Sequence, residues 1–295
     1  MLIAVQLLQV LIYGIGQGSI YIVSGLGFMI IYSVTRVVNF SQGQFLMLGG
    51  MLPYAFYTAG VSLPISILIG VTITTLVGMV EYSGVVQPLI KRGVPRFTII
   101  LATFGTGIVI DGITLIIWGS DVRSYPYFSG HKAINLFQAI INPQALWIMG
   151  TTVLLCSGLG FFFGRTVGGK AFTASAIDPR AASLMGINPE RLGFIAFGMS
   201  AFAASLAGGV MTPLTSTSYA IGLPLSIKGF IAAIMGGLNK TEGVIVGGLA
   251  IGITEALVTA FISSGYKEIT SLLILIIVLI FRPTGLWGLP EAGKV

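Results

Sequence analysis

Three carboxylates stand in or near long apolar runs of the sequence, where an ionisable group is expensive if the run crosses a bilayer. Glu81 precedes Lys91 and Arg92 by a few residues, so we expect its charge to lie at a membrane interface. Asp111 and Glu255 lie deeper in their runs, and each either lines a pathway for a polar solute or links helices through hydrogen bonds. No row of paired carboxylates and basic residues accompanies them, which argues against coupling to an ion gradient.

A second polar feature is the run NFSQGQF, residues 39–45, at the start of an apolar segment. Its uncharged hydrogen-bonding side chains either line a solvated cavity or lie at the membrane interface, and the sequence leaves both interpretations open. The candidate residues of a translocation pathway are therefore Asn39, Ser41, Gln42, Gln44, Asp111 and Glu255.

Other chemistries lack the residues they need. Residues 164–170, GRTVGGK, fit the start of a phosphate-binding loop, but Ala171 stands where the Mg²⁺-binding Ser or Thr is required, and an apolar segment precedes the motif instead of a strand. One histidine, His131, and one cysteine, Cys156, exclude a His-based metal cluster and an intrachain disulfide. No HExxH or GxSxG motif is present. We expect no catalytic residue, no metal site and no cofactor bound by this chain.

The composition indicates a membrane protein. Apolar residues make up 55% of the chain and charged residues 8%, against roughly 25% charged in soluble proteins. The net charge of +6 is explained by basic loops on one side of a membrane, so we expect membrane lipid and no nucleic acid as a partner. The expected spans are residues 5–33, 40–58, 63–86, 97–119, 145–164, 192–211, 225–239, 243–263 and 266–281.

These runs predict an all-α fold, a polytopic transmembrane helix bundle of about 8–9 spans that forms one membrane domain over residues 1–295. The segment 225–239 is short and is either a poor span or a re-entrant half-helix. Small residues spaced by four, such as Gly14 with Gly18 and Gly248 with Gly252, indicate close helix contacts.

The connections between the spans alternate in charge. Eleven of the fifteen basic residues fall on one side: Arg36, Lys91, Arg92, Arg96, Arg165, Lys170, Arg180, Arg191, Lys240, Arg282 and Lys294. The other four, Arg123, Lys132, Lys228 and Lys267, fall on the opposite side. The positive-inside rule makes the first side cytoplasmic, with the N-terminus outside and the C-terminus inside.

The longest polar interval, residues 165–191, lies on that basic side and holds six of the charged residues. Within it, Phe172, Ala176 and Ile177 are followed at roughly helical spacing by Ala181, Leu184 and Met185, and then by Gly186 as a helix C-cap. We expect a short amphipathic helix, Ala176–Gly186, between two spans. Such an element on the basic side indicates a docking site for a soluble partner.

Several segments together resemble the permease subunits of branched-chain amino acid ABC importers, the LivH type. They are GQGSIYIVSGLGFMIIY, VVNFSQGQFLMLGG, EYSGVVQPLIKRG, AIDPRAASLMGINPERL, GFIAAIMGGLNKTEGVIVGGLAIGITEAL and LIFRPTGLWG, in this order over nearly the whole chain.

The resemblance implies a subunit of an ATP-driven importer in the bacterial inner (plasma) membrane. Its partners would be a second, homologous permease in a heterodimer, two cytoplasmic ATPase subunits that carry the ATP and Mg²⁺, and an extracytoplasmic substrate-binding protein. By the same resemblance, residues 165–191 hold the helix that docks in an ATPase. The residues implied in this coupling are Ala176, Asp178, Arg180, Ala181, Ala182, Gly186, Glu190 and Arg191.

The sequence departs from the family at Gln42 and Gln44, where many relatives have His and Glu. The resemblance implies that the substrate is a branched-chain amino acid or a related small polar solute such as urea, a short amide or an aromatic acid. The alternative function is an ion-coupled secondary transporter of small amino-acid-like solutes, which would need no ATPase and usually shows internal repeats.

Overall fold

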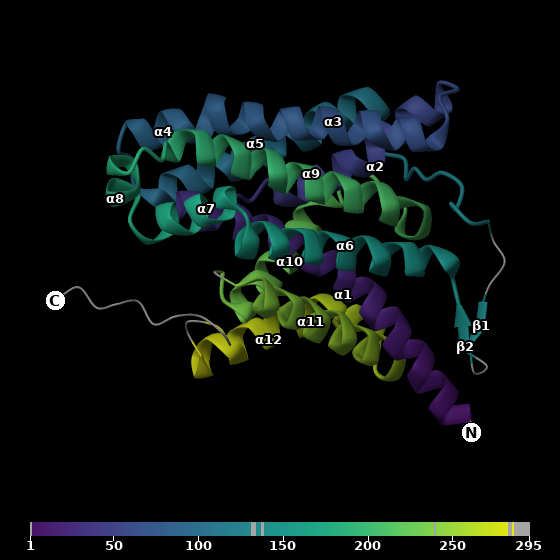
Figure 1. Cartoon of the computed structure of the whole chain (residues 1–295). Coiled ribbons are helices and arrows are strands. Elements are labelled where there is room, and N and C mark those ends of the chain that lie inside the picture. Colours follow the sequence, from purple (N-terminus) through teal and green to yellow (C-terminus); the bar gives the residue numbers. More distant parts are fainter. Residues whose placement is uncertain (1, 131–133, 137–138, 239, 283–284, 286–295) are drawn as a thin grey trace.

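The computed structural model describes residues 2–130, 134–136, 139–238, 240–282 and 285 (Figure 1). Its regular structure is almost entirely helical, which confirms the predicted all-α class. The helices are α1 (Leu2–Thr35), α2 (Gln42–Thr58), α3 (Leu63–Glu81), α4 (Gln87–Lys91), α5 (Arg96–Trp118), α6 (Pro143–Arg165), α7 (Val167–Ile177), α8 (Pro179–Leu184), α9 (Pro189–Thr215), α10 (Gly222–Gly236), α11 (Thr241–Phe261) and α12 (Lys267–Phe281). A π-helical segment, Tyr82–Val86, joins α3 to α4. Strands β1 (Ile134–Leu136) and β2 (Ala139–Ile141) pair antiparallel between α5 and α6.

Seven segments of the described chain are long and apolar enough to cross a bilayer. They are Val5–Thr35, Leu63–Lys91, Arg96–Trp118, Pro143–Arg165, Pro189–Thr215, Thr241–Phe261 and Ser264–Phe281. Each matches a predicted span to within a few residues. The two other predicted spans correspond to shorter helices, α2 with 17 residues and α10 with 15. Together these segments confirm a polytopic bundle of the predicted size within the described residues.

Helix α10 is the segment for which the sequence left two paths open. Ala232 of α10 lies against Gly247 of α11, and Lys228, one turn earlier, pairs with Glu255, two turns later. The two helices therefore run antiparallel, and α10 returns the chain to the end of the bundle at which α9 begins. This path is a short crossing and not a re-entrant half-helix. The non-helical residues 216–221 before α10 explain why 15 helical residues suffice.

Helices α1 and α11 touch along a seam of small residues. Gly14 and Gly18 of α1 lie against Gly248 and Gly252 of α11. A Cβ atom on Gly252 would lie 2.3 Å from the backbone nitrogen of Gly18, a separation that no side chain tolerates. The predicted close helix contacts at these pairs are confirmed, and they bring the two backbones together directly.

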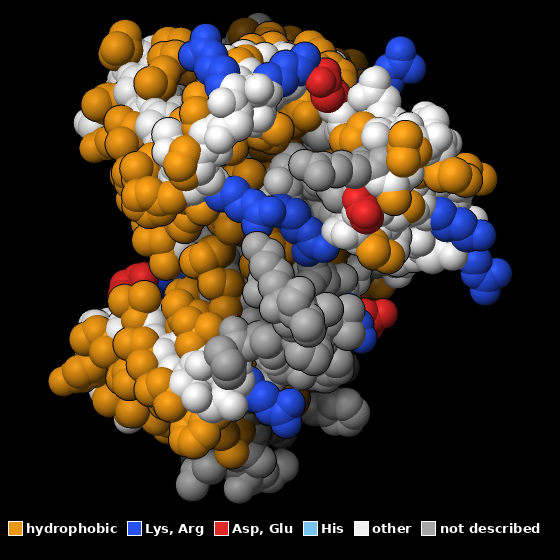
Figure 2. All heavy atoms as spheres, turned by 90° about the vertical axis from the view of Figure 1, so that its left-hand side faces the viewer, with side chains coloured by type: hydrophobic (Ala, Val, Ile, Leu, Met, Phe, Trp, Pro, Cys, Tyr) orange, Lys and Arg blue, Asp and Glu red, His pale blue; other side chains and the backbone are white. Residues whose placement is uncertain are grey.

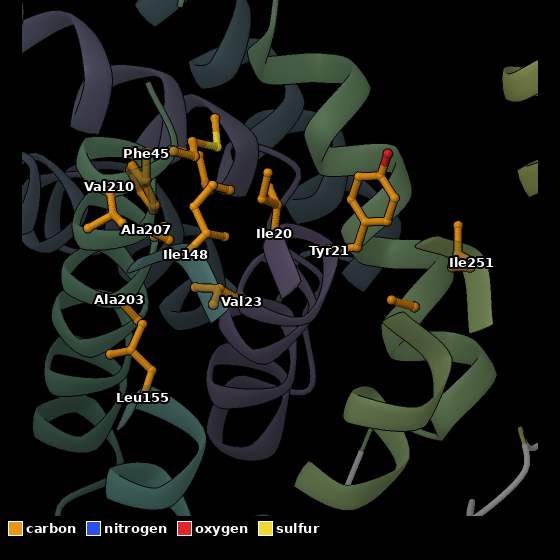
Figure 3. Close-up of a cluster of buried hydrophobic side chains, with 14 of the residues drawn as sticks. Ile20, Tyr21, Val23, Phe45, Ile148, Leu155, Ala203, Ala207, Val210 and Ile251 are labelled. Carbon is orange, nitrogen blue, oxygen red and sulfur yellow. The ribbon is translucent and has the colours of Figure 1, made fainter. Parts of the chain in front are cut away.

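The central core joins six helices, α1, α2, α6, α9, α10 and α11, and Figure 3 shows part of it. Its labelled side chains are Ile20, Tyr21 and Val23 of α1, Phe45 of α2, Ile148 and Leu155 of α6, Ala203, Ala207 and Val210 of α9, and Ile251 of α11. The alanines of α9 leave room for α2, most of which is buried. The polar start of α2 is therefore held inside the bundle.

The two ends of the bundle differ in charge. Helices α4, α7 and α8 lie at one end, and the β1–β2 pair and the start of α1 lie at the other (Figure 1). Viewed from the first end, Figure 2 shows Lys and Arg side chains scattered among hydrophobic ones, with a few acidic side chains between them. We call this the basic end. The described residues that place charge there are Arg36, Lys91, Arg92, Arg96, Arg165, Lys170, Arg191, Lys240 and Arg282. Lys294 and the side chain of Arg180 lie outside the described part of the structure.

At the opposite end, the connection from α5 to α6 is tied to the body. Arg123 and Thr217 exchange two backbone hydrogen bonds of 2.8 Å. The buried Tyr125 hydroxyl donates to the carbonyl oxygen of Gly209. Burial raises the pKa of Tyr125, so its hydroxyl stays a donor at neutral pH. This connection thus holds the ends of α9 and α5 together.

Candidate functional site

The polar stretch 165–191 lies at the basic end and contains two helices, α7 and α8, in place of the single helix Ala176–Gly186 that we expected. The helix is interrupted at Asp178, whose backbone is extended with φ −143°. Pro179 explains the break, because a proline disfavours helical geometry at the residue before it. The Asp178 carboxylate then accepts a hydrogen bond of 3.1 Å from the backbone N–H of Ala181 in α8.

The apolar face of α8 points away from the bundle. Leu184 is 89% exposed and Met185 83% exposed, while Ala182 is buried. The helix ends as predicted at Gly186, whose φ of +83° favours glycine, and the N–H of Ile187 reaches back to the carbonyl of Ala182. Two large apolar side chains thus lie uncovered on a short helix at the basic end.

The remaining coupling candidates connect this region to the bundle. The guanidinium of Arg36, just after α1, donates to the carbonyl oxygen of Ala176 in α7. Glu190, at the start of α9, forms an exposed ion pair of 2.9 Å with Lys91 of α4 and accepts a hydrogen bond from Gln87. Arg191 is exposed. Movement of α7 would therefore reach the end of α1 through Arg36, and movement of α9 would reach α4 through Glu190.

The start of α2 forms the first of two polar clusters inside the bundle, which we call the α2 cluster. Asn39 and Ser41 are fully buried and lie beside the Glu81 carboxylate of α3. The Ser41 hydroxyl is 2.6 Å from Asn39 Oδ1 and also bonds to Glu81. Glu81, which we expected at a membrane interface, has a side chain that is only 3% exposed and is enclosed by these groups.

The two glutamines of the α2 cluster have different surroundings. Gln42 is fully buried, packs against Gly27 of α1, and accepts a hydrogen bond of 2.5 Å from the Ser200 hydroxyl of α9. Gln44 donates to the Asp111 carboxylate of α5 at 3.2 Å. Asp111 is half-buried, with one carboxylate oxygen unpaired. Gln42 is therefore enclosed by protein, whereas Gln44 and Asp111 lie where α2 meets a sparsely packed helix.

Glu255 belongs to the second cluster, which we call the ionic cluster. Its carboxylate is 1% exposed and lies 3.0 Å from the Lys228 ammonium group of α10. It also accepts a hydrogen bond of 2.7 Å from the Tyr21 hydroxyl of α1. Ser271 of α12 also donates to it, and Lys267 lies 3.8 Å away. Glu255 thus links three other helices at a depth where an unpaired charge is costly.

A known family accounts for this arrangement of spans and basic-end helices. The family described as "Branched-chain amino acid transport system / permease component" matches residues 10–281. The chain belongs to this permease family. As a permease component, it is the membrane-spanning part of a transport system, and the predicted membrane-spanning fold and transport function are confirmed at this level.

Individual permeases agree with the family assignment. The chain is 30% identical to the high-affinity branched-chain amino acid transport system permease protein LivH of Escherichia coli K12, over 98% of this chain and 97% of that protein. It is 29% identical to BraD of Pseudomonas aeruginosa over 98% of both, and 28% identical to a probable LivH of Methanocaldococcus jannaschii over 92% and 89%. The permease therefore matches these relatives over almost their full length.

Among solved structures, the permease resembles "PsaBC from Streptococcus pneumoniae in complex with Fab". The TM-score is 0.50 at 13% identity, and the match covers 95% of this chain and 92% of that one. This likeness concerns the fold alone.

Sequence reasoning missed part of the permease's ionic cluster. Lys228 was assigned to the surface opposite the basic end, yet its side chain is only 5% exposed and lies between Glu255 and Glu268. The sequence does contain a signal that Lys228 is buried and paired. Lys228 stands inside the apolar run of α10, and an ionisable residue within a span usually has a partner. The partner itself could not be found, since Glu255 lies on another helix 27 residues later.

Proposed function

We propose that this permease translocates branched-chain amino acids as one subunit of an ATP-driven ABC importer. Two cytoplasmic ATPases would bind ATP and Mg²⁺, and an extracytoplasmic binding protein would deliver the substrate. The relatives named for branched-chain amino acid transport support this substrate class. The chain itself would bind no nucleotide, because Ala171 replaces the Ser or Thr of a phosphate-binding loop.

The observation that carries the proposal is the exposed apolar surface of α8. Leu184, the last residue of α8, and Met185, which follows it, are almost fully exposed at the basic end. Exposed apolar side chains of this size rimmed by charge are typical of a surface that a protein partner covers. Because Arg36 ties α7 to α1, ATPase closure would pull on the bundle core through this contact.

The basic end supports a cytoplasmic placement of α8. Positive residues collect on the cytoplasmic side of plasma-membrane proteins, so we place α4, α7 and α8 inside and the start of α1 outside. The end of α12 would then be cytoplasmic as well.

A second permease would cover α5. This helix exposes Leu101, Ile108 and Ile116, and its Gly105 and Gly112 face open space. It also carries the half-buried Asp111 carboxylate, which lipid would not solvate. A partner permease that encloses an aqueous pathway beside α5 would satisfy Asp111, and Gln44 would then lie on that pathway.

Purification of the chain from mild detergent, with identification of the proteins that accompany it, tests the assembly. We expect two ATPases and a second permease. Reconstitution of that complex with its binding protein should give ATP-dependent leucine uptake. Uptake that proceeds without ATP from the chain alone would overturn the proposal in favour of an ion-coupled carrier.

The variant Leu184→Asp tests the role of α8. Because Leu184 contacts little of its own chain, the variant should fold normally but bind the ATPases at least about tenfold more weakly, as expected for a hot-spot residue. Leu68→Asn, at a 67% exposed residue of α3 that lies in neither proposed interface, is the matched control and should leave ATPase binding unchanged. Equal ATPase binding by the Leu184→Asp variant and the wild type would contradict a docking role for α8.

A further inference from the structure

A pocket of about 270 Å³ opens at the end of the bundle opposite the basic end. It lies between α1, α9, α10 and the start of α12. Its volume suits one small solute and is smaller than the pockets that hold drug-sized ligands. It touches the ionic cluster but not the α2 cluster.

One wall of the pocket carries both signs of charge. Lys228, Lys267 and Glu268 line it, and the buried Glu255 lies behind Lys228. Lys228 bridges inward to Glu255 and outward to Glu268, each at 3.0 Å. The Glu268 side chain is 68% exposed, so its bridge to Lys228 is the weaker of the two and the easier to open.

The rest of the lining is mainly apolar. Ile20, Met211, Ile221 and Leu225 form it, and Gln17 adds an amide. A surface of branched and flexible apolar side chains next to paired opposite charges matches one kind of solute. That solute carries a carboxylate, an ammonium group and a short aliphatic side chain.

We propose that this pocket binds an aliphatic α-amino acid as its zwitterion on the way into the translocation pathway. Lys228 and Lys267 hold the α-carboxylate, which takes the place of Glu268 on Lys228. Glu268 then receives the α-ammonium group. The aliphatic side chain lies against the apolar wall. This inference rests on the proposed function and assigns a binding site to it.

The experiment uses the assembled transporter in lipid nanodiscs without its binding protein, so that only the membrane complex can bind. Three probes are compared by saturation-transfer NMR: leucine, its keto acid 4-methyl-2-oxopentanoate, which lacks the ammonium group, and isopentylamine, which lacks the carboxylate. Wild type should bind leucine more tightly than either analogue.

Two variants separate the two charges of the ligand. Glu268→Gln should weaken isopentylamine by about tenfold, the effect of one lost charge-assisted bond, and should also weaken leucine. The keto acid should bind at least as tightly as to the wild type, because Glu268 no longer competes for Lys228. Lys267→Gln should weaken leucine and the keto acid and leave the amine unchanged. Asp121→Asn, an exposed acid in an ion pair with Arg123, is the matched control and should change nothing.

Two results would overturn the inference. One is the absence of leucine binding to the wild-type complex. The other is an equal change for all three probes in each variant, which is what a purely structural ionic cluster would give. Thermal unfolding of each variant complex identifies folding defects. ATP-driven leucine uptake with the binding protein present is measured separately: normal uptake without binding in the pocket refutes the site alone, while absent uptake refutes the proposed function.

Discussion

The permease buries two polar clusters, and they stabilise a buried carboxylate in different ways. The α2 cluster gathers Asn39, Ser41, Gln42 and Glu81 at the centre of the bundle, and within the described residues no Lys or Arg forms an ion pair with Glu81. The ionic cluster instead pairs Lys228 and Lys267 with carboxylates and borders an open pocket.

The difference indicates different tasks. Hydrogen bonds inside an enclosed cluster fix the positions of helices, although Asn39 Nδ2, Gln42 Nε2 and Glu81 Oε2 of the α2 cluster have no hydrogen-bond partner among the described residues. A set of opposite charges beside a pocket can exchange one of its partners for a ligand. We therefore expect Asn39, Ser41, Gln42 and Glu81 to be the more structural set, although the sequence left the first three, like Glu255, as candidates for the pathway.

The largest effect is expected for Glu255→Gln. It leaves the Lys228 ammonium buried without its inner counter-charge, which typically costs about 3–5 kcal/mol. Thermal unfolding in detergent measures the loss. The double variant Lys228→Met/Glu255→Leu should recover much of it, because apolar residues of similar size often replace a buried ion pair at little cost. A double variant as unstable as the single one would show that the pair has a further structural role.

A smaller loss of stability is expected for Gln42→Ala. It leaves the Ser200 hydroxyl without its acceptor in a buried site, at a cost of about 1–3 kcal/mol. We expect less assembled transporter but unchanged leucine uptake per complex. Ser200→Ala is the matched variant, and its effect should not add to that of Gln42→Ala in the double variant. Altered uptake kinetics with a normal amount of assembled transporter would indicate instead that Gln42 lines the translocation pathway.

Glu81→Gln sharpens the comparison, because it makes the same change as Glu255→Gln in the other cluster. In the part of the chain that the structure describes, no Lys or Arg forms an ion pair with Glu81, and glutamine keeps the length and an acceptor oxygen for Ser41. The expected change in stability is below about 1 kcal/mol. A loss as large as that of Glu255→Gln would mean that the α2 cluster also depends on charge.

The smallest change in stability is expected for Gln44→Leu. Its hydrogen bond to Asp111 is 3.2 Å long, and Asp111 is half-buried, so the loss should stay within about 1 kcal/mol. If Gln44 lies on the pathway, the turnover of leucine uptake should nevertheless change. Unchanged turnover would remove Gln44 and Asp111 from the candidate pathway.

The sequence predicted the elements of this fold well and their contacts poorly. Apolar length located the spans, and the glycine spacing predicted close helix contacts at Gly14 with Gly18 and at Gly248 with Gly252, because both signals are local. That these two pairs contact each other was not predicted. The break at Asp178 was also local, and the effect of Pro179 was overlooked.

The burial of Glu81 and the partner of Lys228 could not be predicted in the same way. Both depend on which helices become neighbours, and one sequence does not show this. Glu81 is enclosed by residues some 40 positions earlier in the chain, and Lys228 by residues of three other helices.

The length of α1 has a consequence for the membrane around the protein. Its 34 residues extend about 51 Å at roughly 1.5 Å per residue, well beyond a hydrocarbon layer of ~30 Å. Figure 1 shows α1 crossing the bundle obliquely to α6 and α9. Because the glycine seam fixes α1 to α11, the two helices must tilt together. A thinner or thicker bilayer would therefore change the inclination of this helix pair as one unit, and lipid composition would act on the pocket beside it.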